Sequence, residues 1–171
     1  MTDDERYLRR ALELAAQAES QGDVPIGGVL VCADFVIEAK NEKELQRDAT
    51  AHAEILLLRE AARRRGSWRL SDATLYVTKE PCIMCAGAIL AARVKRLVYG
   101  ASDPKGGADG GAFDILRSPL TNHRLDVTAG VLEREAAEQL QRFFRARRAA
   151  DEEGIAAPAS QAEAPERWSS G

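Results

Sequence analysis

Two short motifs contain side chains that could hold a metal ion and activate water. The first is His52-Ala53-Glu54, and the second is a Pro-Cys-x-x-Cys sequence that supplies Cys82 and Cys85. An imidazole and two thiolates are typical zinc ligands, and three protein ligands leave one tetrahedral position open for water. Two thiolates cancel the charge of zinc and leave its water less acidic, so a nearby base such as Glu54 would be useful. The motifs therefore predict hydrolytic chemistry at one zinc ion per chain, held by His52, Cys82 and Cys85.

Each motif taken alone has another interpretation. A Cys-x-x-Cys pair can be a redox pair or half of a structural metal site, and a histidine or glutamate at a helix start can simply complement that helix end. The combination favours an open metal site, because the chain has no second Cys-x-x-Cys to complete a closed one. We interpret Cys32 as a buried thiol in a strand. We interpret His123 as a loop residue, with a fourth ligand as the alternative.

The apolar pattern predicts the elements that must position these ligands. Three-and-four spacing indicates helices, and short β-prone runs indicate strands. The expected helices are 4–20, 51–65, 82–92 and 131–148, and the expected strands are 28–32, 35–39, 73–78, 95–100 and 126–129. This order predicts an α/β domain of three layers, a mixed central sheet with helices on both faces. Connections of one hand bring successive helix N-termini to one sheet edge, where the ligands should meet.

Two local details follow from the positions of the ligands. Pro81 suits the first position of the third helix, so both sulfurs should lie in its opening turn. Residues two apart point about 200° apart in a regular helix, so His52 and Glu54 can share a pocket only at a helix start.

Composition limits the class of protein. A chain of 171 residues with 45% hydrophobic and 30% charged residues suits one domain, which we place at residues 1–148. Residues 149–171, rich in Ala, Pro and Ser, carry five acids and one arginine, and we expect a disordered acidic tail. The tail carries a net charge of −4 and the whole chain −3, so residues 1–148 have a net charge of +1. This nearly neutral charge gives no support for nucleic-acid binding. An acidic N-terminus and the lack of a long apolar run predict a cytoplasmic protein that does not enter membranes.

One local cluster could contact RNA. Aromatic and arginine side chains together suit unstacked bases and phosphates. Equally, the arginines could complement the helix dipole while the phenylalanines complete the core. The cluster comprises Arg142, Phe143, Phe144, Arg145, Arg147 and Arg148.

The chain resembles the bacterial tRNA-specific adenosine deaminases of the zinc-dependent cytidine deaminase superfamily, whose signature is His-x-Glu with Pro-Cys-x-x-Cys. The similarity covers nearly all of residues 4–148 and is carried by residues 24–27, Asn41, residues 48–55, 73–78, 80–89 and 143–148. It implies a cytidine-deaminase-like fold and a homodimer. It also implies a hydrolase that converts the wobble adenosine, position 34 of an arginine tRNA anticodon, to inosine by attack of zinc-activated water at C6. Glu54 would transfer the protons.

The resemblance also implies a set of substrate-binding residues for the tRNA anticodon stem-loop. These are Asn41, Ala53, Asp103, Lys105, Phe144, Arg145 and Arg148. Two positions depart from the family: Ala49 replaces a common Pro, and Lys79 replaces a common neutral residue. For Asn41, the alternative is an asparagine that closes a strand into a loop.

Two other functions compete with this one. The same metal and glutamate could serve a deaminase of free guanine or of a cytosine nucleoside or nucleotide. A zinc-stabilised binding module without enzymatic activity is a further alternative.

Overall fold

The computed structural model describes residues 1–154, and all of the predicted helices and strands are present. Each begins and ends within two residues of its predicted bounds, except at the end of the last helix. One short helix, α2, was not predicted. The elements are α1 (Asp3–Ser20), β1 (Gly27–Val31), β2 (Val36–Lys40), α2 (Lys43–Gln46), α3 (Ala53–Arg65), β3 (Thr74–Lys79), α4 (Ile83–Ala91), β4 (Arg96–Ala101), β5 (Asp126–Thr128) and α5 (Glu133–Glu152).

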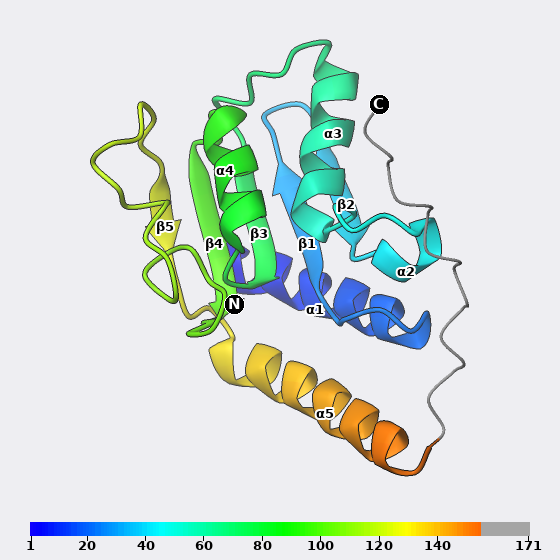
Figure 1. Cartoon of the computed structure of the whole chain (residues 1–171). Helices are drawn as coiled ribbons and strands as arrows, with labels where there is room; N and C mark the ends of the chain where they lie inside the picture. The colour runs from blue at the N-terminus through cyan, green and yellow to red at the C-terminus, as the bar shows by residue number, and fades with distance from the viewer. Residues whose placement is uncertain (155–171) are drawn as a thin grey trace, which may run out of the picture.

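The five strands form one mixed sheet in the order β2-β1-β3-β4-β5 (Figure 1). Strand β1 is antiparallel to both β2 and β3, whereas β3, β4 and β5 are parallel to one another. Consequently β2, β3 and β4 all point the same way, and their carboxyl ends share one edge of the sheet. Helix α3 follows β2 and helix α4 follows β3, so both helices begin at that edge, as predicted.

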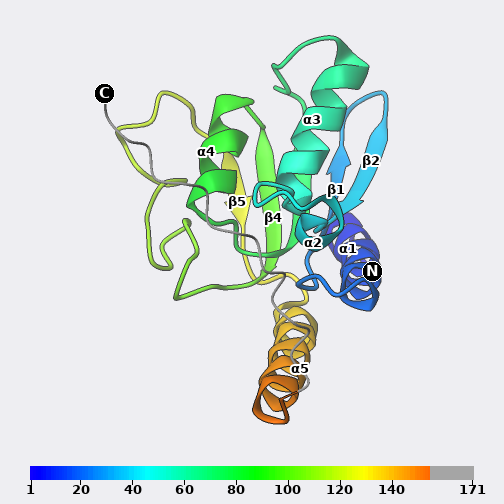
Figure 2. The ribbon, with the colours of Figure 1, turned by 45° about the vertical axis from the view of Figure 1, so that its right-hand side comes forward.

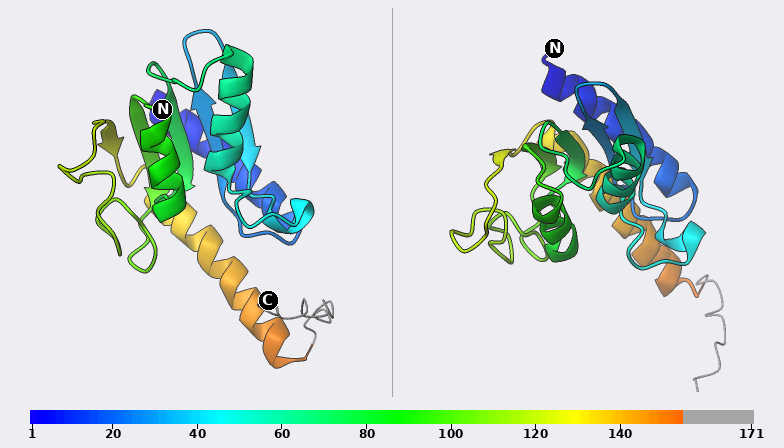
Figure 3. Two further views of the ribbon diagram at one scale, coloured as in Figure 1. Left: turned by 45° about the horizontal axis from the view of Figure 1, so that its top comes forward. Right: turned by 90° about the horizontal axis from the view of Figure 1, so that it is seen from above.

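Apolar side chains alternate along the strands and supply a core on each face of the sheet. The two cores confirm the predicted layers, which the view from above also shows, with α3 and α4 on one side of the sheet and α1 on the other (Figure 3). On the α3 and α4 side the buried strand residues include Leu30, Leu75, Val77 and Leu97. On the α1 side they include Val29, Tyr76 and Val98.

Helix α5 packs on the same side of the sheet as α1. Ala136 and Leu140 bury their side chains against Ala101, and the Gln139 Nε2 donates a hydrogen bond of 3.1 Å to the Leu12 carbonyl. The second half of α5 projects beyond the layers, with most of its side chains exposed (Figure 2). The arginines of this half of the helix are therefore exposed to solvent.

The predicted end of the last helix at residue 148 is wrong by four residues. Helix α5 continues to Glu152, because the alanines and acidic residues at 149–152 are compatible with a helix and extend it. The rest of the expected disordered tail, residues 155–171, lies outside the described residues. Across residues 1–154, the structure contains no helix with the length and apolar character needed to span a bilayer.

Candidate active site

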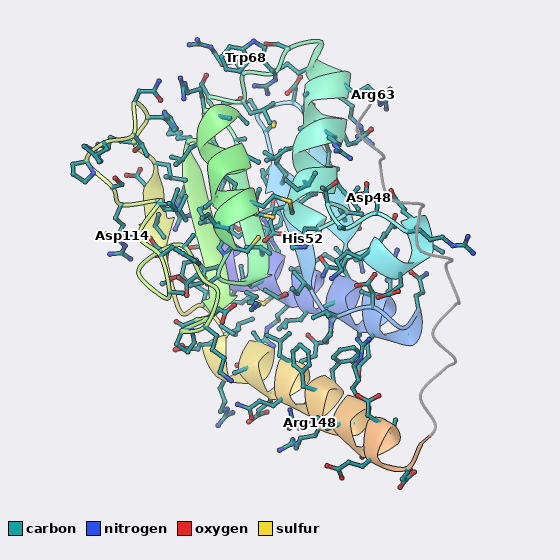
Figure 4. The ribbon with its side chains drawn as sticks, in the orientation of Figure 1. Asp48, His52, Arg63, Trp68, Asp114 and Arg148 are labelled. Atoms are coloured by element: carbon teal, nitrogen blue, oxygen red, sulfur yellow. The ribbon has the colours of Figure 1, made fainter. Side chains whose placement is uncertain are left out.

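His52, Cys82 and Cys85 come together at the carboxyl edge of the sheet, as predicted. His52 is the N-cap of α3 and Cys82 the N-cap of α4, while Cys85 lies within the first turn of α4. The His52 Nδ1 lies 3.7 Å from the Cys82 sulfur and 3.5 Å from the Cys85 sulfur. Figure 4 shows His52 beside yellow sulfur atoms, where α3 and α4 start. Two segments distant in sequence thus form one group of potential metal ligands.

The spacing of the three donor atoms suits zinc. Bonds of about 2.3 Å to sulfur and about 2.05 Å to nitrogen at a tetrahedral angle separate the two donors by about 3.6 Å. The observed separations of 3.7 and 3.5 Å lie on either side of this value. Cys85 is fully buried and the other two ligands are partly buried. Among residues 1–154, this group of three side chains is the one whose donor atoms converge in this way.

The position predicted for Pro81 is wrong by two residues, because the first helical residue is Ile83. Pro81 lies before the N-cap and outside α4, because Cys82 itself has extended backbone angles and starts the helix. The Pro81 carbonyl instead accepts a hydrogen bond of 2.9 Å from the Ala108 amide. Pro81 therefore connects the segment that leads into α4 with the loop that contains Ala108.

The two sulfurs shift each other's pKa in opposite directions. Hydrogen bonding to Cys85, with a further contribution from His52, lowers the pKa of Cys82 to about 3. The same hydrogen bond to Cys82, together with burial, raises the pKa of Cys85 well above its usual range. Binding of a divalent cation by both sulfurs requires both thiols to lose their protons.

Glu54 lies beside the ligands with its carboxyl group nearly excluded from water. It occupies the second position of α3, is 4% exposed, and interacts with the charges of His52 and Cys82. Among residues 1–154, no group hydrogen-bonds to its Oε2 atom. Burial raises the pKa of Glu54, which suits a group that must accept and then return a proton. A buried carboxylate oxygen without a partner is costly, so its presence indicates a partner other than these side chains.

Asn41 connects the end of β2 to the start of α3. Its Oδ1 accepts a hydrogen bond of 3.0 Å from the Ala53 amide, one of the donors that a helix start leaves unsatisfied. The His52 side chain makes no such cap, so Asn41 supplies it from another segment. Both Asn41 and Ala53 are buried. Asn41 therefore caps the start of α3. The predicted substrate contacts of Asn41 and Ala53 remain predictions.

Five of the predicted substrate-binding residues lie around one hollow of about 580 Å³. Its lining includes the basic end of α5 and the loop that follows β4. The residues are Asp103, Lys105, Phe144, Arg145 and Arg148, joined by Lys79, Leu140 and Gln141. The unusual Lys79 lies here because its Nζ pairs with Asp103 Oδ2 at 2.5 Å. Burial opposes ionisation of Asp103, but this pairing holds its pKa below the usual value.

The structure separates the two phenylalanines of α5. Phe143 is buried and its ring packs edge-on against Phe144 at 5.3 Å between centroids. Phe144 is 40% exposed and lines the hollow with Arg145 and Arg148. The core interpretation is therefore confirmed for Phe143, whereas Phe144 is exposed and its contact with RNA remains a prediction.

Sequence reasoning did not identify Glu80 as a residue of the site. Its buried carboxylate accepts hydrogen bonds from the amides of Asp103 at 2.7 Å, Asp109 at 2.9 Å and Gly111 at 3.1 Å. The available signal was the glycine-rich loop at 105–111. Its glycines allow the loop to wrap around the Glu80 carboxylate.

Cys32 and His123, which the sequence analysis placed outside the metal site, are not among the converging donor atoms. Cys32 is a buried free thiol, as predicted, but it lies in the connection between β1 and β2, one residue beyond the end of β1. His123 lies in a loop, and its Nε2 is 2.7 Å from the Val94 carbonyl. His123 is not among the converging ligands, so the alternative of a fourth ligand is wrong.

Comparisons with known proteins agree with this geometry. A family model described as MafB19-like deaminase matches residues 2–148. The tRNA-specific adenosine deaminase of Bacillus subtilis is 47% identical over 146 residues, which cover 85% of this chain and 91% of that protein. A solved structure from studies of A-to-I editing by tRNA:A34 deaminases has a TM-score of 0.74 and 45% identity, covering 79% of this chain and 99% of that chain. That match confirms the predicted cytidine-deaminase-like fold. The guanine deaminase of Bacillus subtilis has a TM-score of 0.57 and 32% identity, covering 86% of this chain and 95% of that chain.

Proposed function

Because the chain belongs to the MafB19-like deaminases and groups with the tRNA-specific adenosine deaminases, we propose that it converts wobble adenosine 34 of an arginine tRNA anticodon to inosine. The overall reaction adds water at C6 of the base and releases ammonia. The observation that carries the proposal is a buried Glu54 oxygen, which has no hydrogen-bond partner within residues 1–154, beside three converging potential metal ligands. We further propose that the enzyme acts in the cytoplasm, where bacterial tRNA is found.

His52, Cys82 and Cys85 are proposed to hold one zinc ion per chain. When bound, zinc supplies a Lewis acid that makes a water molecule more acidic. The helix N-termini at Cys82 and His52 stabilise negative charge and so favour the thiolates. Cys85 contributes from a fully buried position, which excludes water from one side of the site.

Glu54 is proposed to move the protons of the reaction. Its carboxylate takes a proton from the attacking water and delivers it to N1 of the adenine ring. The second water proton passes by the same carboxyl group to the departing amine, which leaves as ammonia. The raised pKa of Glu54 supports this role, because a group that alternates between acid and base works best with a pKa near the working pH.

The anticodon stem-loop is the proposed partner of the hollow beside the site. Asn41 would donate from its Nδ2 to the extruded base, since its Oδ1 already accepts from Ala53. Phe144 offers a ring on which a neighbouring base can stack, and Arg145 and Arg148 would pair with phosphates. Asp103 and Lys105 line the same hollow from the loop after β4.

We also propose a homodimer formed through the outer face of α3 and α4. A groove of about 530 Å³ lies there, and its lining is mostly apolar: Ile55, Leu58, Arg59, Ala62, Trp68, Ala88, Ala91 and Ala92. Trp68 is 58% exposed, which is costly for a large apolar ring in water. A Trp68→Asp variant should sediment as a monomer if a second copy covers this face. Wild-type protein that sediments as a monomer at micromolar concentration would refute the dimer.

An inosine assay tests the activity directly. Zinc-loaded protein should convert A34 in an arginine anticodon stem-loop, and a chelator should abolish the conversion. Glu54→Gln should keep its zinc and lose roughly 10²–10⁴-fold in rate. If Glu54→Gln retains wild-type activity, the proton role is wrong. If no nucleobase or nucleoside is deaminated at all, the chain is a binding module.

The similarity to a guanine deaminase makes a free base the second candidate substrate. The same metal and glutamate would serve either ring, so the surface residues must discriminate. Replacing both Arg145 and Arg148 with Ala should impair turnover of the stem-loop and leave a free base unaffected. Activity on free guanine alone, equal in wild type and double variant, would favour the second candidate.

A further inference from the structure

The loop that follows β4 is folded around two buried acidic side chains. Glu80 lies at the end of β3 and receives three main-chain amides of this loop, from Asp103, Asp109 and Gly111. Such an arrangement satisfies both carboxylate oxygens with charge-assisted hydrogen bonds, which are roughly twice as strong as neutral ones. The loop conformation therefore depends on this one side chain from a different strand.

The glycines of the loop are required by the position of Glu80. A β-carbon at position 107 would lie 2.2 Å from the Glu80 Cδ, and one at position 111 would lie 2.2 Å from the Asp103 carbonyl oxygen and 3.0 Å from the Glu80 Oε1. No side chain could occupy either place without displacing the carboxylate or the loop. The glycines thus permit close wrapping, and the hydrogen bonds then hold the wrapped loop in place.

Asp109 is the second buried acid and is clamped from two sides. Its side chain is completely buried, accepts a hydrogen bond of 2.9 Å from the Tyr99 hydroxyl, and forms a bidentate pair with Arg117 at 2.8 Å for both bonds. Burial and Asp109 together raise the pKa of Tyr99, so the tyrosine stays a neutral donor. Arg117, from further along the chain, closes the loop over Asp109.

This loop reaches both the metal ligands and the hollow. At one end, Gly107 forms a β-bridge with the ligand Cys82. At the other end, Asp103 lines the hollow and its side chain accepts hydrogen bonds of 3.1 Å from the amides of Lys105 and Gly106. A shift of the loop would therefore move the hollow-lining side chains relative to the metal ligands.

We propose that Glu80, Asp109 and Arg117 are positioning residues that hold Asp103 and Lys105 in the geometry that receives a polynucleotide. We refer to these three side chains as the loop clamp. The inference rests on the proposed function for its substrate. The loop clamp acts through the main chain and does not touch the reacting atoms. Its loss should weaken binding of the stem-loop more than it slows the chemical step.

Arg117→Ala tests the loop clamp with the least risk to folding, because the Arg117 side chain is 58% exposed. In zinc-loaded protein, the amides of Asp109 and Gly111 should exchange with deuterium at least about tenfold faster, since a charge-assisted restraint is lost. The KM for the stem-loop should rise about tenfold, with kcat within about twofold of wild type. Arg117→Lys, which restores one charge without the bidentate geometry, should recover part of both effects.

Arg124→Ala is the matched control. Arg124 lies on the same long connection and hydrogen-bonds only to the carbonyls of Ser118 and Pro119 within the described residues, so its removal should change neither amide exchange nor KM. The proposal is overturned if Arg117→Ala matches the control in both measurements. It is also overturned if kcat and zinc content fall while KM stays constant, because the loop clamp would then support the proposed zinc ligands. Asp109→Asn, which keeps the side-chain volume, repeats the test.

The exchange measurement needs no substrate and so separates this inference from the proposed function. Wild-type protein that is inactive on the stem-loop refutes the function, and the KM prediction fails with it. Faster exchange at Asp109 and Gly111 in Arg117→Ala would still support the loop clamp as a structural device.

Discussion

Replacement of Asn41 by alanine should separate a structural from a catalytic contribution at one position. The Asn41 Oδ1 accepts from the Ala53 amide at 3.0 Å, and both residues are buried, Ala53 completely. Alanine at 41 leaves that amide without its partner, which costs about 1–3 kcal/mol of unfolding free energy. Loss of a side-chain cap from a helix start falls in the same range, about 0.5–2 kcal/mol, and describes the same bond. A chain of this size should then lose about 2–4 °C in Tm for each kcal/mol.

Asn41→Asp is the matched variant for this prediction. Aspartate keeps an oxygen acceptor for the Ala53 amide and loses only the Nδ2 donor that would face a substrate. Its negative charge at the start of α3 is favourable to the helix dipole by about 0.3–1 kcal/mol. We therefore expect Asn41→Asp to retain most of the wild-type stability. Both variants should lose roughly ten- to hundredfold in kcat/KM for the stem-loop, the equivalent of one buried hydrogen bond.

Urea unfolding followed by circular dichroism measures the stability of the two variants, and the inosine assay measures their activity. Zinc content is determined first, so that loss of metal is not mistaken for loss of the cap. If Asn41→Ala unfolds at the same urea concentration as wild type, the bond to Ala53 contributes nothing and the structural reasoning fails. If Asn41→Asp keeps full activity, the proposed contact between Nδ2 and the base is wrong.

Three further perturbations follow from particular contacts. Cys85→Ala should lose both zinc and stability, because metal binding contributes to folding; zinc close to one atom per chain by atomic absorption would contradict the ligand assignment. Hydrogen bonding to Arg96 lowers the pKa of Asp4 below its usual 3.8, so the stabilisation is present above that pH and is lost as pH falls through the folded pKa. Discounted for partial exposure, Asp4→Asn should cost about 1 kcal/mol at pH 7 by urea unfolding, and this cost should shrink as the pH falls through the folded pKa; a constant difference would refute this. Replacing Arg145 and Arg148 with Ala should reduce the slope of log KM against log salt by about 1.4–1.8 for the stem-loop; an unchanged slope would remove both from the phosphate contacts.

The order of the elements and the three potential metal ligands could be predicted from sequence because both depend on local signals. Apolar spacing identified the helices and strands, and α3 and α4 begin close to their predicted starts. His52 and Glu54 were expected to share a pocket only at a helix start, and they are the N-cap and second residue of α3. The short α2 was missed because it buries no residue and leaves no apolar pattern. The predicted end of α5 was early because composition alone does not mark where a helix stops.

The type and spacing of side chains by themselves determined the α/β order of elements and the presence of an imidazole, two thiols and a carboxylate that could serve a metal site. Only the tertiary structure decided which distant groups share a bond. In the folded chain the Ala53 amide donates to Asn41, and Lys79 pairs with Asp103. Glu80 accepts hydrogen bonds from a loop more than twenty residues away. The physical reason is that hydrogen bonds and ion pairs depend on separations of about 3 Å in space. The packing of helices on the sheet sets these separations, and they cannot be predicted from residues that are adjacent in the sequence.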